Sequence, residues 1–202
     1  PYIPDEAIEK CIEVLRSGNL VQGLYAEKFE QAISDYLDVK HAMVVSSGTA
    51  ALHLSLIALG IGPGDEVIVP AFSFPATANV VELVGAKPVF VDIKLDDFCI
   101  DASFIESVIT NNTKAIIPVH EFGMPANMKP VLKLAEKYKL FIIEDAACAL
   151  GAEYENRKAG AFGNLGCFSF HPRKAITTGE GGVVVTNDIS LAEKIRAIRN
   201  HG

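Results

Sequence analysis

Lys174 is the residue whose type and surroundings point most directly to covalent chemistry. It follows Arg173 and stands shortly before a loop with three glycines in four positions, Gly179-Glu180-Gly181-Gly182. A lysine amine can attack a carbonyl and form a Schiff base, and glycines let the backbone approach a ligand closely. Most lysines, however, are solvated surface residues, and the glycine loop also fits a plain hairpin turn. The residues by themselves leave both interpretations open.

Two further candidate residues, one carboxylate and one aromatic ring, come at the end of apolar runs or just after them. Asp145 follows Glu144 at the end of an apolar run. There it could keep a pyridinium nitrogen protonated through a charge-assisted hydrogen bond, or it could cap a following helix. Phe74 follows another apolar run and could stack on a flat ring, although core packing is the commoner role of such a side chain.

A further pattern, Ser46-Ser47-Gly48-Thr49, fits the start of a helix. Free N–H groups at a helix start bind anions such as phosphate, and Gly48 would allow a close approach to the backbone. Serine and threonine are also ordinary N-cap residues, so the pattern taken alone favours simple capping.

Short apolar runs alternate with amphipathic stretches along the chain. The runs are rich in Val and Ile, which is typical of strands in a parallel sheet that helices cover on both faces. We therefore expect a three-layer α/β sandwich with a mostly parallel seven-stranded sheet, in which one of the last two strands can run antiparallel. The expected strands are His41–Val45, Glu66–Val69, Pro88–Val91, Ala115–Val119, Leu140–Ile143, Cys167–Phe170 and Gly182–Val185. The expected helices are 5–17, 25–37, Thr49–Leu59, Ala76–Val84, Phe104–Ile109, Pro130–Tyr138 and Ser190–Ile198.

This arrangement would bring the chemical groups together. Each of the patterns above follows an expected strand, and the carboxyl ends of parallel strands meet at one edge of the sheet, where ligands bind. His120 also ends a strand, and we leave open whether it contacts a substrate or has a structural role.

Composition excludes several classes of protein. A formal net charge of −7 over 202 residues argues against a nucleic-acid-binding surface, and the sequence has no run of about 18 apolar residues that could cross a membrane. The cysteines at positions 11, 99, 148 and 167 show no metal-binding spacing, so no metal is expected. Three of them lie in apolar surroundings and are expected in the core, which fits a reducing cytoplasm.

The sequence resembles the DegT/DnrJ/StrS family of sugar aminotransferases, which have the fold type I architecture of pyridoxal-phosphate enzymes. The resemblance implies that Lys174 carries pyridoxal 5'-phosphate, that Asp145 pairs with the pyridine nitrogen and that Phe74 stacks on the ring. It further implies that Gly48, Thr49 and Ser169 contact the phosphate. Cys148 stands near the ring hydroxyl, where the family more often has Gln or His. The matching stretches are SSGTAALHLSLIALGIGPGDEVIVPAFSFPATAN, KPVFVDI, FIIEDAACALGAEY and FSFHPRKAITTGEGGVVVTND.

The same resemblance implies an activity. Family members transfer an amino group from an amino acid, commonly glutamate, to a keto group of a nucleotide-linked sugar. Dehydratase relatives have histidine in place of the Schiff-base lysine, so Lys174 argues against sugar dehydration. A non-catalytic regulatory protein with the same fold is a further alternative, which the joint presence of Lys174, Asp145 and Ser169 makes less favourable.

The resemblance also implies a domain organisation. Residues 1–202 correspond to the cofactor-binding large domain, with N-terminal helices over about 1–38 and the α/β sheet region over about 39–202. The family's smaller C-terminal domain is not present in these residues, and the family builds its active site across a homodimer. The expectation is therefore a partial chain, and the activity of these residues alone is left open.

Overall fold

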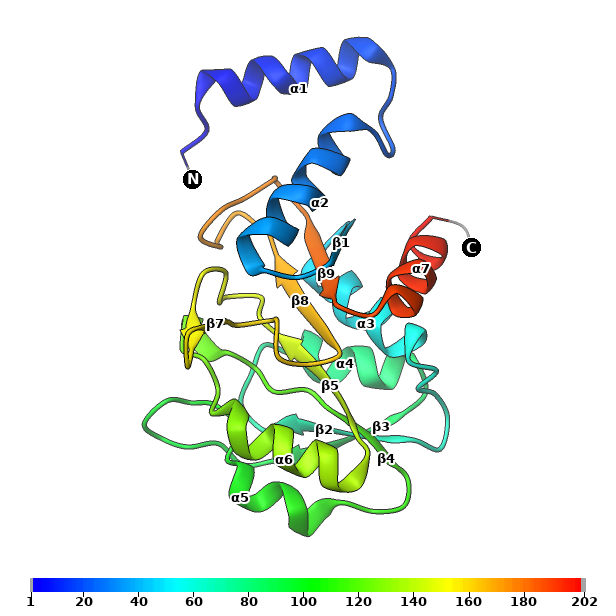
Figure 1. The fold of residues 1–202 in the computed structure, drawn as a ribbon, viewed down its shortest axis with the longest axis vertical. Helices are drawn as coiled ribbons and strands as arrows, with labels where there is room; N and C mark the ends of the chain where they lie inside the picture. Colours follow the sequence, from blue (N-terminus) through cyan, green and yellow to red (C-terminus); the bar gives the residue numbers. More distant parts are fainter. Residues whose placement is uncertain (1, 201–202) are drawn as a thin grey trace.

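A seven-stranded, mostly parallel sheet forms the centre of the structure, a computed structural model that describes residues 2–200 (Figure 1). Only β9 runs antiparallel to its neighbours, and the other pairings are parallel. The predicted sheet and its one reversed strand are therefore confirmed. In spatial order the strands are β1 (His41–Val45), β9 (Gly182–Thr186), β8 (Leu165–Ser169), β5 (Phe141–Asp145), β4 (Thr113–Ile116), β2 (Glu66–Pro70) and β3 (Lys87–Val91).

Helices cover both faces of this sheet. One face packs against α3 (Gly48–Ala58), α4 (Ala76–Leu83) and α7 (Ile189–Ile198). The other packs against α2 (Leu24–Leu37), the short α5 (Ala102–Ile105) and α6 (Met128–Tyr138). All five residues of β2 are buried, because alternate side chains enter opposite layers: Val67 and Val69 join the first, and Ile68 joins the second.

The pleat of β5 has a consequence for the site. Glu144 and Asp145 are neighbours in the same strand and both are buried. Successive side chains of a strand point to opposite faces, so the two carboxylates enter different layers. Asp145 lies on the side of α4, where it meets Thr77, and Glu144 lies on the other side, where it meets the segment around residues 160–163.

The first helix, α1 (Asp5–Ser17), stands apart from the sheet at one end of the molecule (Figure 1). None of its residues is buried, and Ile8, Ile12 and Leu15 are exposed. The helical spacing of these residues predicts the helix correctly. The expectation of three core cysteines is wrong: Cys11 on this helix and Cys148 are exposed, and only Cys99 and Cys167 are buried.

Two segments differ from expectation because they are too short for periodicity to reveal them. The stretch Phe104–Ile109 forms the end of one-turn α5 and a 3-10 turn, Glu106–Val108, rather than a helix of its own. A small hairpin pairs β6 (Glu153–Tyr154) with β7 (Arg157–Lys158) and has no counterpart in the sequence-based expectation. Within residues 2–200, none of the helices has the length and apolar character needed to cross a bilayer.

Candidate active site

A cavity of about 540 Å³ lies where the carboxyl ends of the strands meet. Its wall is built from the segments that follow β1, β2, β4, β5 and β8, together with the residues that lead into β9. The residues predicted to hold a cofactor come together here from four different parts of the chain. They are Gly48, Thr49, Phe74, Asp145, Cys148, Ser169 and Lys174.

The N-terminus of α3 forms one side of the cavity. Ser47 is the N-cap, and its hydroxyl accepts a hydrogen bond from the N–H of Ala50 at 3.0 Å. The capping interpretation is therefore correct, but the N–H groups of Gly48 and Thr49 come before Ala51, whose N–H is the first to donate within the helix, and they remain available to an anion. A Cβ at Gly48 would lie 2.8 Å from the Cβ of Ser169. Glycine is required for Ser169 to come this close to the helix start.

Asp145 is a buried residue of the cavity wall. Its carboxylate accepts hydrogen bonds from the hydroxyl of Thr77 at 2.8 Å and from the N–H of Ala147 at 3.2 Å. Burial raises the pKa of Asp145, while the Thr77 hydroxyl, the Ala147 N–H and the charge of Lys174 act in the opposite direction. No helix begins after Asp145, so the capping alternative is wrong. A buried carboxyl of this kind gains from a cationic partner in the cavity.

Lys174 is half-buried and borders the cavity. Its backbone N–H donates to the carbonyl of His171 at 2.8 Å, in the turn that follows β8. Its amine donates to the thiol of Cys148 across a distance of 3.0 Å. The interpretation of Lys174 as a fully solvated surface lysine is therefore wrong, because the turn directs the amine toward the ligand space.

Phe74 lies in the cavity wall with 67% of its surface exposed. The core-packing alternative for this ring is wrong. An exposed aromatic face beside a cavity is free to stack on a planar ligand, which keeps the stacking role as a prediction.

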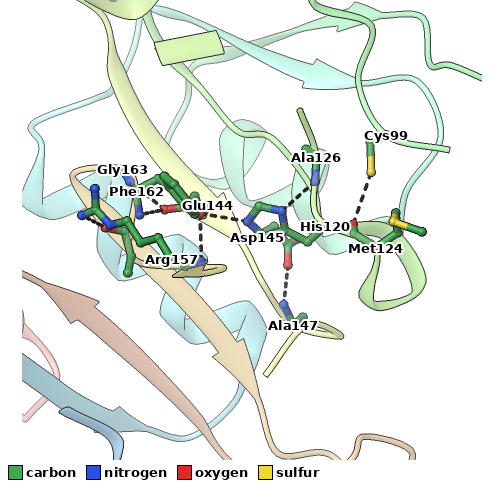
Figure 2. Close-up of polar contacts among 12 residues, drawn as sticks. Cys99, His120, Met124, Ala126, Glu144, Asp145, Ala147, Arg157, Phe162 and Gly163 are labelled. Atoms are coloured by element: carbon green, nitrogen blue, oxygen red, sulfur yellow. Dashed lines mark hydrogen bonds and ion pairs between the residues drawn. The ribbon is translucent and has the colours of Figure 1, made fainter. Parts of the chain in front are cut away.

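His120 and Glu144 form a buried pair beside the cavity (Figure 2). Glu144 accepts hydrogen bonds from the N–H groups of Gly160 at 2.8 Å and of Phe162 and Gly163 at 2.6 Å each. The imidazole Nδ1 of His120 accepts from the N–H of Ala126 at 3.0 Å, so Nε2 carries the proton and donates to Glu144 at 2.9 Å.

Both ring nitrogens of His120 thus have partners inside the protein, which favours a structural role for this residue of the cavity wall. Glu144 has no role in the sequence-based expectation, because its partners lie 16 to 24 residues away in the chain.

Four other residues of the site were not found from the sequence. Thr77 orients Asp145, and Glu121 lines the cavity. His171 and Glu180 also line it and lie 3.7 Å apart, imidazole nitrogen to carboxylate oxygen. These residues occupy loops and a first helical turn, where nothing in residue type or spacing distinguishes them from ordinary solvated groups.

Two curated relatives are similar over most or all of the chain. GDP-perosamine synthase of Caulobacter vibrioides is 50% identical over 89% of this chain and 48% of the relative. UDP-4-amino-4-deoxy-L-arabinose–oxoglutarate aminotransferase of Shewanella sediminis is 44% identical over 100% of this chain and 52% of the relative. The chain spans about half the length of the curated relatives it matches.

A solved structure and a family model agree with these relatives. A protein of Streptococcus pneumoniae that is assigned as a sugar aminotransferase, solved in its PLP form, matches with a TM-score of 0.95 at 33% identity, over 100% of this chain and 57% of that chain. The model of the DegT/DnrJ/EryC1/StrS aminotransferase family matches residues 1–202. With the cavity described above, these matches establish that the chain belongs to the DegT/DnrJ/EryC1/StrS aminotransferase family.

Proposed function

We propose that this protein is a pyridoxal-phosphate-dependent aminotransferase that transfers an amino group from an amino acid, with glutamate as the donor, to a keto group of a nucleotide-linked sugar. The observation that carries the proposal is the meeting of three features in one cavity. These are the amine of Lys174, the buried carboxyl of Asp145 and the glycine-constrained start of α3 at Gly48.

The cavity fits the cofactor in charge and shape. The free N–H groups of Gly48 and Thr49 and the hydroxyl of Ser169 would bind the phosphate. The buried Asp145, whose ionised form is disfavoured by its surroundings, would be stabilised by a protonated pyridine nitrogen. Phe74 offers an exposed ring face for stacking. When bound, the cofactor supplies an electron sink for the carbon that loses its proton.

The chain's own residues then have distinct tasks. Asp145 holds a proton on the ring nitrogen, and Thr77 fixes the carboxylate in the orientation that this requires. Lys174 provides the amine that carries the cofactor and, once displaced, moves a proton at the substrate carbon. Cys148 accepts a hydrogen bond from that amine and thereby holds it beside the cavity.

The substrate class is supported by the relatives. The names of both curated relatives include a nucleotide-linked amino sugar. Members of the family that dehydrate sugars have histidine at the position of Lys174. The presence of lysine here favours amino transfer over dehydration.

The first prediction tests the cofactor assignment with Lys174→Ala in the full-length protein. We expect the wild type to show a visible Schiff-base absorption with pyridoxal phosphate and to retain the label on Lys174 after borohydride reduction. Lys174→Ala should lose both signals, because among residues 2–200 Lys174 is the one lysine that lines the cavity. Glutamate should convert the wild-type spectrum to the pyridoxamine form.

Lys133→Ala, at an exposed position of α6, is the matched control and should keep the wild-type spectrum. The assignment would be wrong if Lys174→Ala still formed the covalent adduct. A protein that binds the cofactor but does not react with glutamate would support the regulatory alternative.

We further propose that the enzyme is a homodimer and works in the cytoplasm. An uncovered apolar stripe on α1, formed by Ile8, Ile12 and Leu15, gives a second copy of the chain a surface to cover. All four cysteines are free thiols, which suits a reducing compartment.

A further inference from the structure

Glu121 is a buried carboxyl in the cavity wall that the proposed reaction does not use. Its residue is only 9% exposed, and it lines the cavity. Within residues 2–200, no group donates a hydrogen bond to this carboxylate. Every fully enclosed side-chain oxygen and nitrogen of the described residues has a partner. The oxygens of Glu121 are therefore not fully enclosed by the protein, and the space that this residue lines is the cavity.

The electrostatic surroundings of Glu121 agree with an unpaired position. Burial raises the pKa of its carboxyl, and the charge of Asp145 raises it further, whereas Lys174 lowers it. Partial burial of a carboxylate that receives no hydrogen bonds is energetically unfavourable. A ligand in the cavity that donates hydrogen bonds to Glu121 would offset this desolvation free energy.

The segment around Glu121 is fixed from both sides. On one side, His120 is tied to Glu144 at 2.9 Å. On the other, Phe122 has a φ of 52°, a left-handed conformation that is rare for a bulky residue and costs about 1–3 kcal/mol. Its ring packs against Phe72 and Phe98, with centroid separations of 6.1 Å and 5.9 Å. These contacts fix the backbone on both sides of Glu121, a residue of the cavity wall.

The charge of Glu121 discriminates between the two substrates of the proposed reaction. Glutamate brings two carboxylates, which a third carboxylate repels. A sugar ring brings hydroxyl groups, which donate hydrogen bonds to a carboxylate. The Glu121 carboxylate therefore favours binding of the sugar in this site.

We propose that Glu121 is a specificity-determining residue that accepts a hydrogen bond from a ring hydroxyl of the sugar substrate. This inference rests on the proposed aminotransferase function and names a sugar contact within the same site.

The two half-reactions test the proposal separately in the full-length enzyme loaded with pyridoxal phosphate. The donor half-reaction is followed with glutamate. The sugar half-reaction is followed in reverse, with GDP-perosamine or UDP-4-amino-4-deoxy-L-arabinose, whichever the wild type deaminates faster. Glu121→Gln keeps a neutral acceptor and should lower kcat/KM for the amino sugar about 10-fold, and Glu121→Leu, which keeps none, about 100-fold. Both variants should keep the Schiff-base absorption and a glutamate half-reaction no slower than that of the wild type, because each variant removes the charge that repels the donor.

Glu136→Gln, on the exposed side of α6, is the matched control and should change neither half-reaction. Equal losses in both half-reactions would show a structural role, and no loss in either would show that Glu121 does not contact the sugar. Both results would overturn the proposal. A wild type that lacks the cofactor absorption, or that glutamate does not convert to the pyridoxamine form, would contradict the proposed function first, so the two failures are distinguishable.

Discussion

At the scale of single residues, two adjacent carboxylates of β5 have opposite energetic roles. Glu144 accepts three backbone N–H groups and the imidazole of His120, so its burial is compensated within the fold. Asp145 has two donors, Thr77 and Ala147, and its charged form remains disfavoured. The buried charge of Asp145 thus lowers the folding stability of the protein, and the same charge prepares the site for a cationic ligand. Such a combination is common in active sites.

This difference predicts the effect of Asp145→Asn. Because burial raises the pKa of Asp145 in the folded state, folding is favoured most below the carboxyl's unfolded pKa, and that stability is lost as the pH rises through the folded pKa. The variant has no charge to bury, so the cofactor-free variant should be more stable than wild type at pH 7, with a gap that closes toward acidic pH. Urea unfolding from pH 4 to pH 8 measures it.

The same variant should lose about 100-fold or more of the amino-transfer activity, because the ring nitrogen loses its charged partner. A stability gap that does not change with pH would contradict the assignment of the unfavourable charge to Asp145.

At the scale of elements, Glu144 is the residue that connects the loops of the site. Its carboxylate joins β5 to the segment that leads into β8, through Gly160, Phe162 and Gly163. Through His120 it also reaches the loop that carries Glu121 and Phe122. Figure 2 shows these contacts converging on one side chain. Two loops that border the cavity therefore depend on one buried carboxylate.

Glu144→Gln should consequently destabilise the protein by about 3 kcal/mol, because the amide places N–H groups against backbone N–H donors and leaves buried groups unsatisfied. Urea denaturation measures the loss, and Glu193→Gln on the exposed side of α7 is the control. A change below about 0.5 kcal/mol, the range of ordinary surface substitutions, would show that these contacts do not hold the loops.

At the scale of the whole molecule, the N-terminal helix is the part without a partner. Figure 1 shows α1 beyond α2, away from the sheet. A helix with an apolar stripe is normally stabilised by packing that stripe. In residues 2–200 nothing covers Ile8, Ile12 and Leu15, so the proposed homodimer would complete the packing of α1.

The assembly prediction uses Ile12→Glu and Leu15→Glu in the full-length protein. Burying one such side chain contributes about 1.5–3 kcal/mol, and a two-fold interface loses it twice, so each variant should weaken the dimer by at least about tenfold. Light scattering after size-exclusion chromatography over a dilution series measures this. Glu6→Lys, on the opposite side of α1 by helical periodicity, should leave the mass unchanged. A monomeric wild type, or variants that associate as wild type does, would contradict the proposed interface.

The sequence by itself determined the mostly parallel sheet and the edge where the candidate residues gather, and it left open which of the last two strands is reversed. Runs of Val and Ile and helical spacing are local signals, so β2 and α6 can be read from a few consecutive residues each. Lys174, Asp145 and Gly48 follow such elements, and the geometry of a parallel sheet brings strand ends to one edge. That is why their meeting in one cavity follows from the sequence.

Only the tertiary structure decided which side chains have partners. Thr77 reaches Asp145 across 68 residues of chain, and Glu144 reaches His120 across 24. The accessibility of the Glu121 carboxylate and the exposure of the apolar stripe of α1 likewise depend on which segments pack against them. Burial and hydrogen bonding are properties of the assembled layers, and no local pattern encodes them, because the groups that satisfy a side chain come from distant segments.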